Sequence, residues 1–254
     1  MLLAIDIGNT NTVLGVFDGE TLVDSWRIKT DARVPADELA LVYRGVLHGH
    51  EVTAIAASST VPAVLRELRR MLERYYGGLP TVIVEPGVRT GVSLLVDNPK
   101  EVGADRIVNT LAAHVLVGGP AIVVDFGTST NFDVVSAKGE FLGGALAPGV
   151  EISVDALADR AAQLRRIELV APRSPIGKNT VEALQSGILY GVAGQVDGLV
   201  RRLRAALSPD DPEAVHVIAT GGLAPLAIAH SETVSRYEPA LTLIGLRLIF
   251  ERNT

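Results

Sequence analysis

The sequence contains no cysteine, few aromatic residues and no long hydrophobic run. Without cysteine, a disulfide framework, a thiol nucleophile and a zinc-thiolate site are all excluded. The uncharged stretch Val115–Val124 is far too short to cross a membrane and is interrupted by glycines and a proline. The opening residues MLLAIDIGNT include an acid at position 6 and no basic residue, so we expect no secretion signal. The chain is therefore predicted to act without a membrane.

Positive charge is also scarce, with 23 Lys and Arg residues against 29 Asp and Glu, a net charge of −6. This balance argues against a nucleic-acid binder held by phosphate neutralisation. A hydrophobic content of 48% excludes an intrinsically disordered chain. A length of 254 residues is enough for one large domain or two smaller ones. We expect a soluble, cytoplasmic protein.

The hydrophobic pattern predicts strands at the start of the chain and an alternation of helices and strands after them. The predicted opening strands are Leu2–Ile7, Val13–Phe17 and Leu22–Ile28. Later strands are predicted at Thr53–Ala57 and Thr81–Glu85, and a helix is predicted to begin near Ala104. The class is therefore α/β.

The opening pattern recurs after Gly118-Gly119-Pro120. Asp6 aligns with Asp125 and Gly8 with Gly127, each followed by polar residues and a second strand. At the same spacing, Thr10 falls on Ser129, Val13 on Phe132 and Val16 on Val135. The recurrence predicts two related domains, residues 1–117 and 118–254.

The two repeated turns carry side chains that suit a nucleotide. An acid at a strand end is followed by a glycine and by hydroxyl and amide groups, which can bind phosphate oxygens. A carboxylate such as that of Asp6 suits Mg²⁺, usually through water. One such turn alone could be a hairpin whose polar groups only satisfy the turn, but the second copy favours phosphate binding. Thr220-Gly221-Gly222 forms a third glycine turn, suited to close passage of a nucleotide.

A long helix is predicted from about Asn179 to Leu207, with glycines on one face at positions 187, 191, 194 and 198. Glycine inside a helix costs about 0.5–1 kcal/mol relative to alanine, so this face should contact something in compensation. Another backbone of the same chain and a second copy of the chain both fit this requirement.

Several segments, taken in order, resemble the acetate and sugar kinase, Hsp70 and actin superfamily. Within it, the chain resembles type III pantothenate kinase essentially end to end. The segments that carry this resemblance are Asp6–Thr12, residues 98–106 (NPKEVGADR), Asp125–Thr130, Gly177–Thr180 and residues 219–222 (ATGG). The resemblance implies two duplicated RNase H-like (actin-like ATPase) domains with a nucleotide cleft between them.

The resemblance also implies a reaction, ATP-dependent phosphorylation of pantothenate to 4′-phosphopantothenate, the first step of coenzyme A biosynthesis. It places the ATP phosphate loop on Asp6, Ile7, Gly8, Asn9, Thr10, Asn11, Thr12 and Val13, with a further nucleotide contact at Thr128. It places pantothenate on Gly103, Ala104, Asp105 and Arg106, and on Thr180 contributed across a homodimer. Mg²⁺ would bind through water at Asp6, and a monovalent cation, K⁺ or NH₄⁺, at Asp125.

Asp105 corresponds to the proton acceptor for the attacked hydroxyl. At a predicted helix N-terminus, the helix dipole and the neighbouring Arg106 should favour its ionised form. An ionised carboxylate can accept the hydroxyl proton in a phosphoryl transfer. Without the resemblance, an ordinary helix-start acid paired with Arg106 explains the same residues.

Two positions depart from the family pattern. Asn131 stands where the family usually has threonine, and Val96 stands where several relatives have tyrosine against the substrate. Two other functions therefore stay open: a kinase for another small hydroxyl substrate such as a sugar, and a catalytically silent homologue that acts as a regulator or scaffold.

Overall fold

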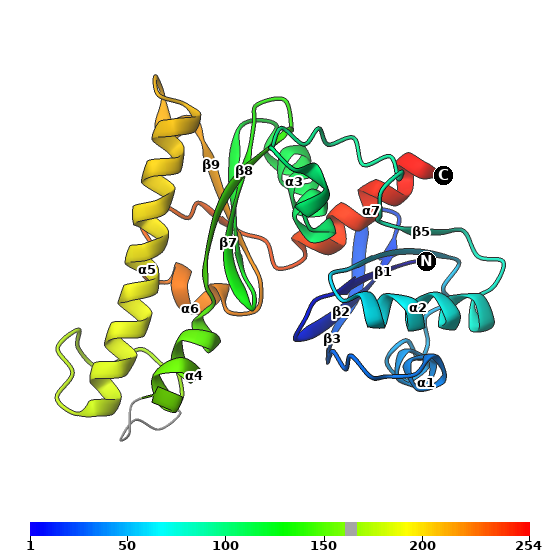
Figure 1. The fold of residues 1–254 in the computed structure, drawn as a ribbon, viewed down its shortest axis with the longest axis horizontal. Helices are drawn as coiled ribbons and strands as arrows, with labels where there is room; N and C mark the ends of the chain where they lie inside the picture. The colour runs from blue at the N-terminus through cyan, green and yellow to red at the C-terminus, as the bar shows by residue number, and fades with distance from the viewer. Residues whose placement is uncertain (161–166) are drawn as a thin grey trace. The chain divides into compact units, whose positions relative to one another are not determined.

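The computed structural model describes residues 1–160 and 167–254, which divide into two units. The first unit comprises Met1–Val92, Asn98–Ala112 and Ala240–Thr254, and the second comprises Ser93–Asp97 and Ala113–Pro239. Each unit contains one five-stranded sheet (Figure 1). Within the described ranges, we find no helix with the length and apolar character that a membrane crossing requires.

The sheet of the first unit has the order β3-β2-β1-β4-β5. Its strands are β1 (Leu2–Ile7), β2 (Asn11–Asp18), β3 (Thr21–Lys29), β4 (Ala54–Ser59) and β5 (Thr81–Ile83). β2 runs antiparallel to both β1 and β3, whereas β4 is parallel to both β1 and β5. The helical elements are α1 (Ala36–Val46), α2 (Pro62–Tyr75), η1 (Pro99–Glu101), the start of α3 (Ala104–Val117) and α7 (Leu241–Asn253).

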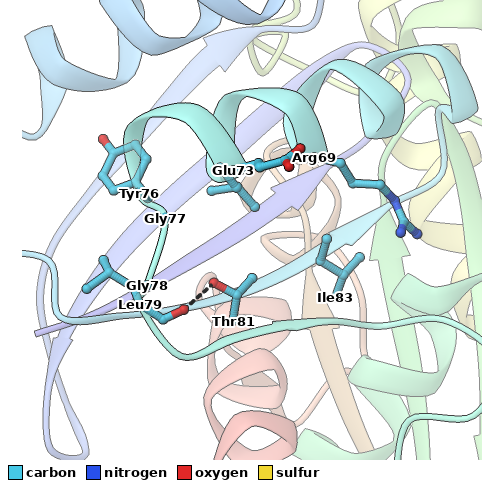
Figure 2. A pocket seen from close by; sticks show the side chains of 9 residues that line it. Arg69, Glu73, Tyr76, Gly77, Gly78, Leu79, Thr81 and Ile83 are labelled. Atoms are coloured by element: carbon cyan, nitrogen blue, oxygen red, sulfur yellow. Dashed lines mark hydrogen bonds between the residues drawn. The ribbon is translucent and has the colours of Figure 1, made fainter.

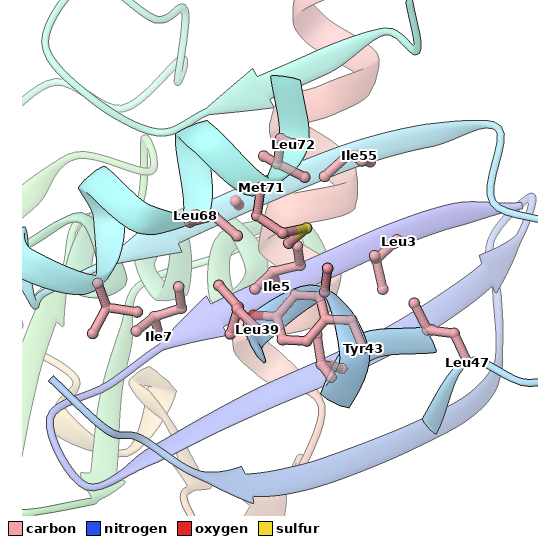
Figure 3. Close-up of a cluster of buried hydrophobic side chains, with 14 of the residues drawn as sticks. Leu3, Ile5, Ile7, Leu39, Tyr43, Leu47, Ile55, Leu68, Met71 and Leu72 are labelled. Atoms are coloured by element: carbon pink, nitrogen blue, oxygen red, sulfur yellow. The ribbon is translucent and has the colours of Figure 1, made fainter. Parts of the chain in front are cut away.

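The alternation of side chains along β1 gives this sheet two buried faces. Leu3, Ile5 and Ile7 lie in one core cluster with side chains of α1 and α2, which Figure 3 shows. Ala4 lies in a second cluster with side chains of α3 and α7. Because both faces are covered, β1 is apolar almost throughout, and its end is the first point where polar groups can gather.

One side chain of the first cluster carries an unsatisfied polar group. Tyr43 on α1 is fully buried, and its hydroxyl has no hydrogen-bond partner among the described residues. Burial also raises the pKa of Tyr43, so the hydroxyl stays protonated. A buried hydroxyl without a partner costs about 1–3 kcal/mol of stability.

We therefore expect Tyr43→Phe to raise the free energy of unfolding by about 1 kcal/mol, since it removes the unsatisfied group and keeps the ring. Urea denaturation of the two proteins measures this difference. A lower stability of Tyr43→Phe would show that the hydroxyl is satisfied in solution, for instance by a buried water.

Helix α7 places the end of the chain in the first unit. Leu243, Leu246 and Ile249 are buried in the cluster that contains Ala4. Gly245 lets this helix approach α3 closely, because a Cβ there would lie 2.6 Å from Val108 Cγ1. The C-terminal residues Ala240–Thr254 therefore belong to the first unit, whereas Ser93–Asp97 and residues 113–117 belong to the second. The domain boundaries 1–117 and 118–254 stay a prediction.

The second unit contains a sheet of order β10-β9-β6-β7-β8. Its strands are β6 (Ala121–Phe126), β7 (Ser129–Val135), β8 (Phe141–Pro148), β9 (His216–Thr220) and β10 (Arg236–Tyr237). Its helices are α4 (Val150–Arg160), α5 (Thr180–Leu207), η2 (Pro212–Ala214) and α6 (Ala224–Ile228). α5 and α6 cover a core cluster that includes Val124 and Phe132.

Read from its other edge, the second sheet has the order β8-β7-β6-β9-β10, which matches the first sheet strand for strand. β6 corresponds to β1, β7 to β2 and β9 to β4, with the same antiparallel and parallel pairings. This correspondence confirms the α/β class and the repetition of one architecture. It also places Asp6 and Asp125 at equivalent strand ends.

Candidate functional site

The first predicted phosphate turn connects β1 to β2. The backbone N–H of Gly8 donates to the carbonyl oxygen of Asn11 at 3.0 Å, and a Cβ on Gly8 would lie 3.1 Å from that oxygen. Asn9 and Thr10 are exposed at the tip of the turn. The glycine therefore permits a tight turn that presents polar groups to solvent.

Two of the predicted nucleotide residues face inward instead. The side chain of Ile7 belongs to the core of the first unit, and its carbonyl oxygen accepts a hydrogen bond from the Thr60 N–H at 3.0 Å. Thr12 is buried, and its hydroxyl lies 2.8 Å from that of Thr30. Thr30 also donates its N–H to the Thr10 carbonyl oxygen at 3.0 Å. The side chains of Ile7 and Thr12 thus stabilise the turn from the interior of the unit. Only the backbone of these two residues would be able to contact phosphate.

Asp6 lies at the other side of this turn and has a partner that the sequence reasoning missed. The hydroxyl of Ser58 on β4 donates to Asp6 Oδ1 at 2.8 Å. The parallel register of β1 and β4 places the two residues opposite each other. The only signal in the sequence is the polar pair Ser58-Ser59 that follows the predicted strand Thr53–Ala57.

The second turn, between β6 and β7, is one residue shorter than the first. Ile7 pairs with Thr12 in the first hairpin, whereas Phe126 pairs with Thr130 in the second. The offset of 119 therefore holds for β1 and β6 but becomes 118 after the turn. The predicted equivalences of Thr10 with Ser129, Val13 with Phe132 and Val16 with Val135 are wrong by one residue for this reason.

Two glycines pack against the backbone of the second turn. Gly149 directly precedes α4, and a Cβ there would collide with the Thr128 carbonyl oxygen and lie 2.7 Å from that of Gly127. Gly221 has a φ of +92°, and its Cβ would lie 2.5 Å from the Phe126 carbonyl oxygen and 2.8 Å from Asp125 Oδ1. A glycine is thus required at position 221 of the third glycine turn, because the backbone there lies against other atoms of the same unit.

The two departures from the family pattern have local partners in the second unit. The side-chain oxygen of Asn131 accepts a hydrogen bond from the Ser129 hydroxyl at 2.8 Å. Val96 lies beside Gly143, whose Cβ would be 3.7 Å from Val96 Cγ1. Asn131 therefore braces the turn, and Val96 offers an apolar surface.

Asp105 lies in the first turn of α3 and is partly buried. Its Oδ1 accepts a hydrogen bond from the Arg106 N–H at 2.9 Å and occupies the space where a Cβ of Gly103 would be. Burial raises the pKa of Asp105, although the Arg106 N–H and the Arg106 charge act in the opposite direction. Arg106 thus favours the ionised form, as predicted, but the sequence did not show the burial, which outweighs it.

Thr180, the first residue of α5, is exposed. The preceding Asn179 caps the helix, since its side chain accepts a hydrogen bond from the Glu182 N–H at 2.9 Å. Glu182 in turn pairs with Arg173, which lowers the pKa of Glu182. These contacts hold the segment before α5 in place and leave the Thr180 side chain exposed to solvent.

A surface depression of about 320 Å³ lies elsewhere, between α2 and β5 (Figure 2). It is lined by side chains that include Arg69, Glu73, Tyr76 and Thr81, and by none of the predicted site residues. In residues 1–160 and 167–254 we also find no cluster of three or more His, Cys, Asp or Glu side chains that could enclose a metal ion.

The sequence matches known proteins over its whole length. A family model described as type III pantothenate kinase matches residues 2–202. A type III pantothenate kinase of Frankia alni is 69% identical over 253 residues, covering all of both chains. Those of Salinispora arenicola and Streptomyces coelicolor are 66% and 60% identical, and each covers all of this chain and 98% or more of the relative.

Solved structures resemble the chain more distantly. The activator of 2-hydroxyisocaproyl-CoA dehydratase from Clostridium difficile, with bound ADPNP, has a TM-score of 0.57 at 13% identity and covers 99% of this chain and 95% of its own. The inorganic polyphosphate/ATP-glucomannokinase from Arthrobacter sp. strain KM has a TM-score of 0.53 at 15% identity, covering 100% and 99%. At these identities the likeness shows the fold alone, and it confirms the duplicated actin-like architecture.

Proposed function

The chain belongs to the type III pantothenate kinase family and is a kinase that phosphorylates pantothenate with ATP in coenzyme A biosynthesis, and we propose that Asp6, Asp105 and Asp125 divide the work of that reaction. The product is 4′-phosphopantothenate. We place the reaction in the cytoplasm, where ATP is produced and used.

Asp105 is the proposed proton acceptor, and its geometry is the observation that carries this assignment. Its carboxylate is held over Gly103 by the Arg106 N–H, and its raised pKa makes it a better base than an exposed aspartate. It takes the proton of the pantothenate hydroxyl as that oxygen attacks the γ-phosphate of ATP. Arg106 suits the carboxylate of pantothenate, and Gly103 and Ala104 supply backbone at the substrate.

Asp6 is the proposed residue for Mg²⁺, with the turn Ile7–Val13 binding the ATP phosphates. A single carboxylate fits this ion, because Mg²⁺ keeps several waters and is usually held by one or two carboxylates together with substrate phosphates. When bound, the ion neutralises charge on the phosphoryl group that is transferred. Gly8 allows the turn to approach that group, and the exposed Asn9 and Thr10 donate to phosphate oxygens.

Asp125 is the proposed ligand of a monovalent cation, K⁺ or NH₄⁺. Asp125 Oδ1 and the Phe126 carbonyl oxygen both lie close to Gly221, at 2.8 Å and 2.5 Å from the position of an added Cβ. A carboxylate and a carbonyl oxygen are suitable ligands for a hard cation. Thr128, exposed on the adjoining turn, supplies a hydroxyl to the nucleotide.

ATP turnover tests these assignments together. We expect ADP release that requires pantothenate and is stimulated when K⁺ or NH₄⁺ replaces a large organic cation. Pantothenate-dependent turnover without any such stimulation would show that Asp125 does not bind a monovalent cation needed for the reaction. A preference for a hexose in a substrate panel would contradict pantothenate as the substrate. No turnover with any acceptor would contradict the kinase activity itself.

We also propose that the protein is a homodimer joined through α5. Gly187, Gly191 and Gly194 are exposed on this helix, and no described atom outside the helix backbone lies within 4 Å of a Cβ built on any of them. The described part of the same chain therefore does not provide the close contact that the glycines suggest. Ile176 and Val181, near the start of α5, are exposed apolar side chains that a second copy would cover. Thr180 would then contact the pantothenate bound to the other copy.

We expect Gly194→Leu to convert the dimer to a monomer and to raise the KM for pantothenate, because leucine blocks close approach of two helices. Sedimentation equilibrium and steady-state kinetics measure the two effects. Gly45→Leu is the matched control, since Gly45 is an exposed glycine of α1 with open space around it. An unchanged dimer in Gly194→Leu would exclude this face as the interface.

A further inference from the structure

Ser58 is a buried polar residue for which the reaction described above has no use. It is 1% exposed, so it cannot touch a nucleotide or a metal ion itself. It lies at the end of β4, a strand that is otherwise apolar in its buried part. Its hydroxyl donates to Asp6 Oδ1 at 2.8 Å. The side chain is thus directed at the carboxylate that we assign to Mg²⁺.

A hydrogen bond from a buried hydroxyl fixes the rotation of the carboxyl group that accepts it. Ser58 can do this for Asp6, since Ser58 is itself held by the ladder of β1 and β4. A carboxylate that meets a metal ion through water needs this fixed orientation, and groups that orient a ligand in this way typically change metal affinity by about 10–100-fold when they are removed.

The second unit repeats the arrangement at the level of the strands. Thr220 lies opposite Asp125 in the parallel register of β6 and β9, as Ser58 lies opposite Asp6 in that of β1 and β4. Thr220 is 3% exposed. Each unit therefore places a buried hydroxyl residue beside its strand-end aspartate. The equivalent position holds serine in the first unit and threonine in the second. Ser58→Thr is therefore a conservative variant.

We propose that Ser58 is a positioning residue that orients the Asp6 carboxylate for the metal-bound nucleotide. This inference rests on the proposed role of Asp6 as the residue that holds Mg²⁺ through water. Ser58→Ala is expected to weaken binding of ADP in the presence of Mg²⁺ by about tenfold. Binding of ADP in the presence of EDTA should not change, because the phosphate turn itself is intact.

The test is calorimetric titration of the full chain with ADP, in Mg²⁺ and in EDTA. Ser58→Thr should restore the Mg²⁺-dependent affinity, whereas Ser58→Cys, which keeps the size but donates weakly, should resemble alanine. Ser59→Ala is the matched control, because the Ser59 hydroxyl contacts only the backbone of Val61 in the hydrogen bonds observed. If Ser58→Ala does not fold, the contrast between the cysteine and threonine variants decides the question.

Asp6→Asn separates this inference from the proposed function. If Asp6→Asn loses the Mg²⁺-dependent affinity and Ser58→Ala keeps it, the role of Ser58 is overturned and that of Asp6 stands. If Ser58→Ala loses affinity equally in Mg²⁺ and EDTA and melts at a lower temperature, Ser58 is only structural. If Asp6→Asn binds as wild type does, both assignments fail. None of these titrations contains pantothenate, so the identity of the acceptor substrate does not affect them.

Discussion

Asp105→Asn should lower kcat for pantothenate by about 10²–10⁴-fold, the range that a positioned general base contributes. Asparagine has the same shape and can still accept the Arg106 N–H bond, so the loss would report the missing base. Steady-state kinetics at saturating ATP and pantothenate measure the change. Asp18→Asn, on an exposed hairpin of the same unit, is the control and should have no effect.

The pH profile adds a second measurement of the same residue. Asp105 must be ionised to accept a proton, and burial raises its pKa. The acidic limb of kcat/KM should therefore lie at a higher pH than an exposed aspartate would give, and this limb should be absent from the residual activity of Asp105→Asn. A near wild-type rate in the variant would contradict the assignment.

Stability should change in the opposite direction to activity. Because the folded-state pKa of Asp105 is raised, its protonated form is favoured by folding. That contribution is fully present below the unfolded pKa and is lost as the pH rises through the folded pKa. Above the folded pKa the ionised carboxylate therefore destabilises the fold, and there Asp105→Asn should melt at a higher temperature than wild type. The difference should vanish at low pH, where wild-type Asp105 is neutral in both states.

Local pattern was enough to predict much of this fold. The strand Leu2–Ile7 is observed with the same bounds, and α5 begins within one residue of the prediction and ends at Leu207. These segments are long or strongly apolar, so their periodicity is unambiguous. The repeat of the acid and glycine turn also indicated the duplication that the two matching sheets confirm. The predicted register was wrong after the turn, because a turn shortened by one residue leaves the residues before it aligned and shifts those after it.

The packing around the turns could not be predicted in the same way. Ser58 lies 52 positions from Asp6, and only the pairing of β1 with β4 brings them together. The sequence around Asp105 showed the helix start and Arg106 but not the burial that reverses the direction of its pKa shift. The sequence shows that Gly221 belongs to a glycine turn. It does not show why a glycine is needed there, which is the closeness of Phe126 and Asp125. Such contacts depend on residues far apart in the chain.

Gly149→Ala should damage the second turn, because the added methyl group would meet the backbone of that turn. The Cβ would collide with the Thr128 carbonyl oxygen and lie 2.7 Å from both the Thr128 carbonyl carbon and the Gly127 oxygen. These are backbone atoms, so no side chain can rotate to make room. The carbonyl oxygen of Gly149 also accepts the Ser153 N–H at 3.0 Å, which ties this residue to the first turn of α4.

We expect two effects from this collision. Overpacking of this kind costs about 1–3 kcal/mol of stability. A displacement of about 1 Å at a substrate-positioning group can cost about 10²-fold in rate, so kcat/KM for ATP should fall by about that factor if Thr128 binds the nucleotide. Thermal denaturation and initial rates at varied ATP measure the two quantities.

Gly45→Ala distinguishes this collision from the general effect of replacing a glycine. Gly45 lies inside α1 with nothing within 4 Å of an added Cβ, so alanine there should stabilise the fold by about 0.5–1 kcal/mol and leave the kinetics unchanged. If Gly149→Ala loses stability but keeps the wild-type kcat/KM for ATP, the turn at Thr128 does not bind the nucleotide. If it matches wild type in both respects, α4 can move away from the turn without cost, and the close contact between them does not fix the turn.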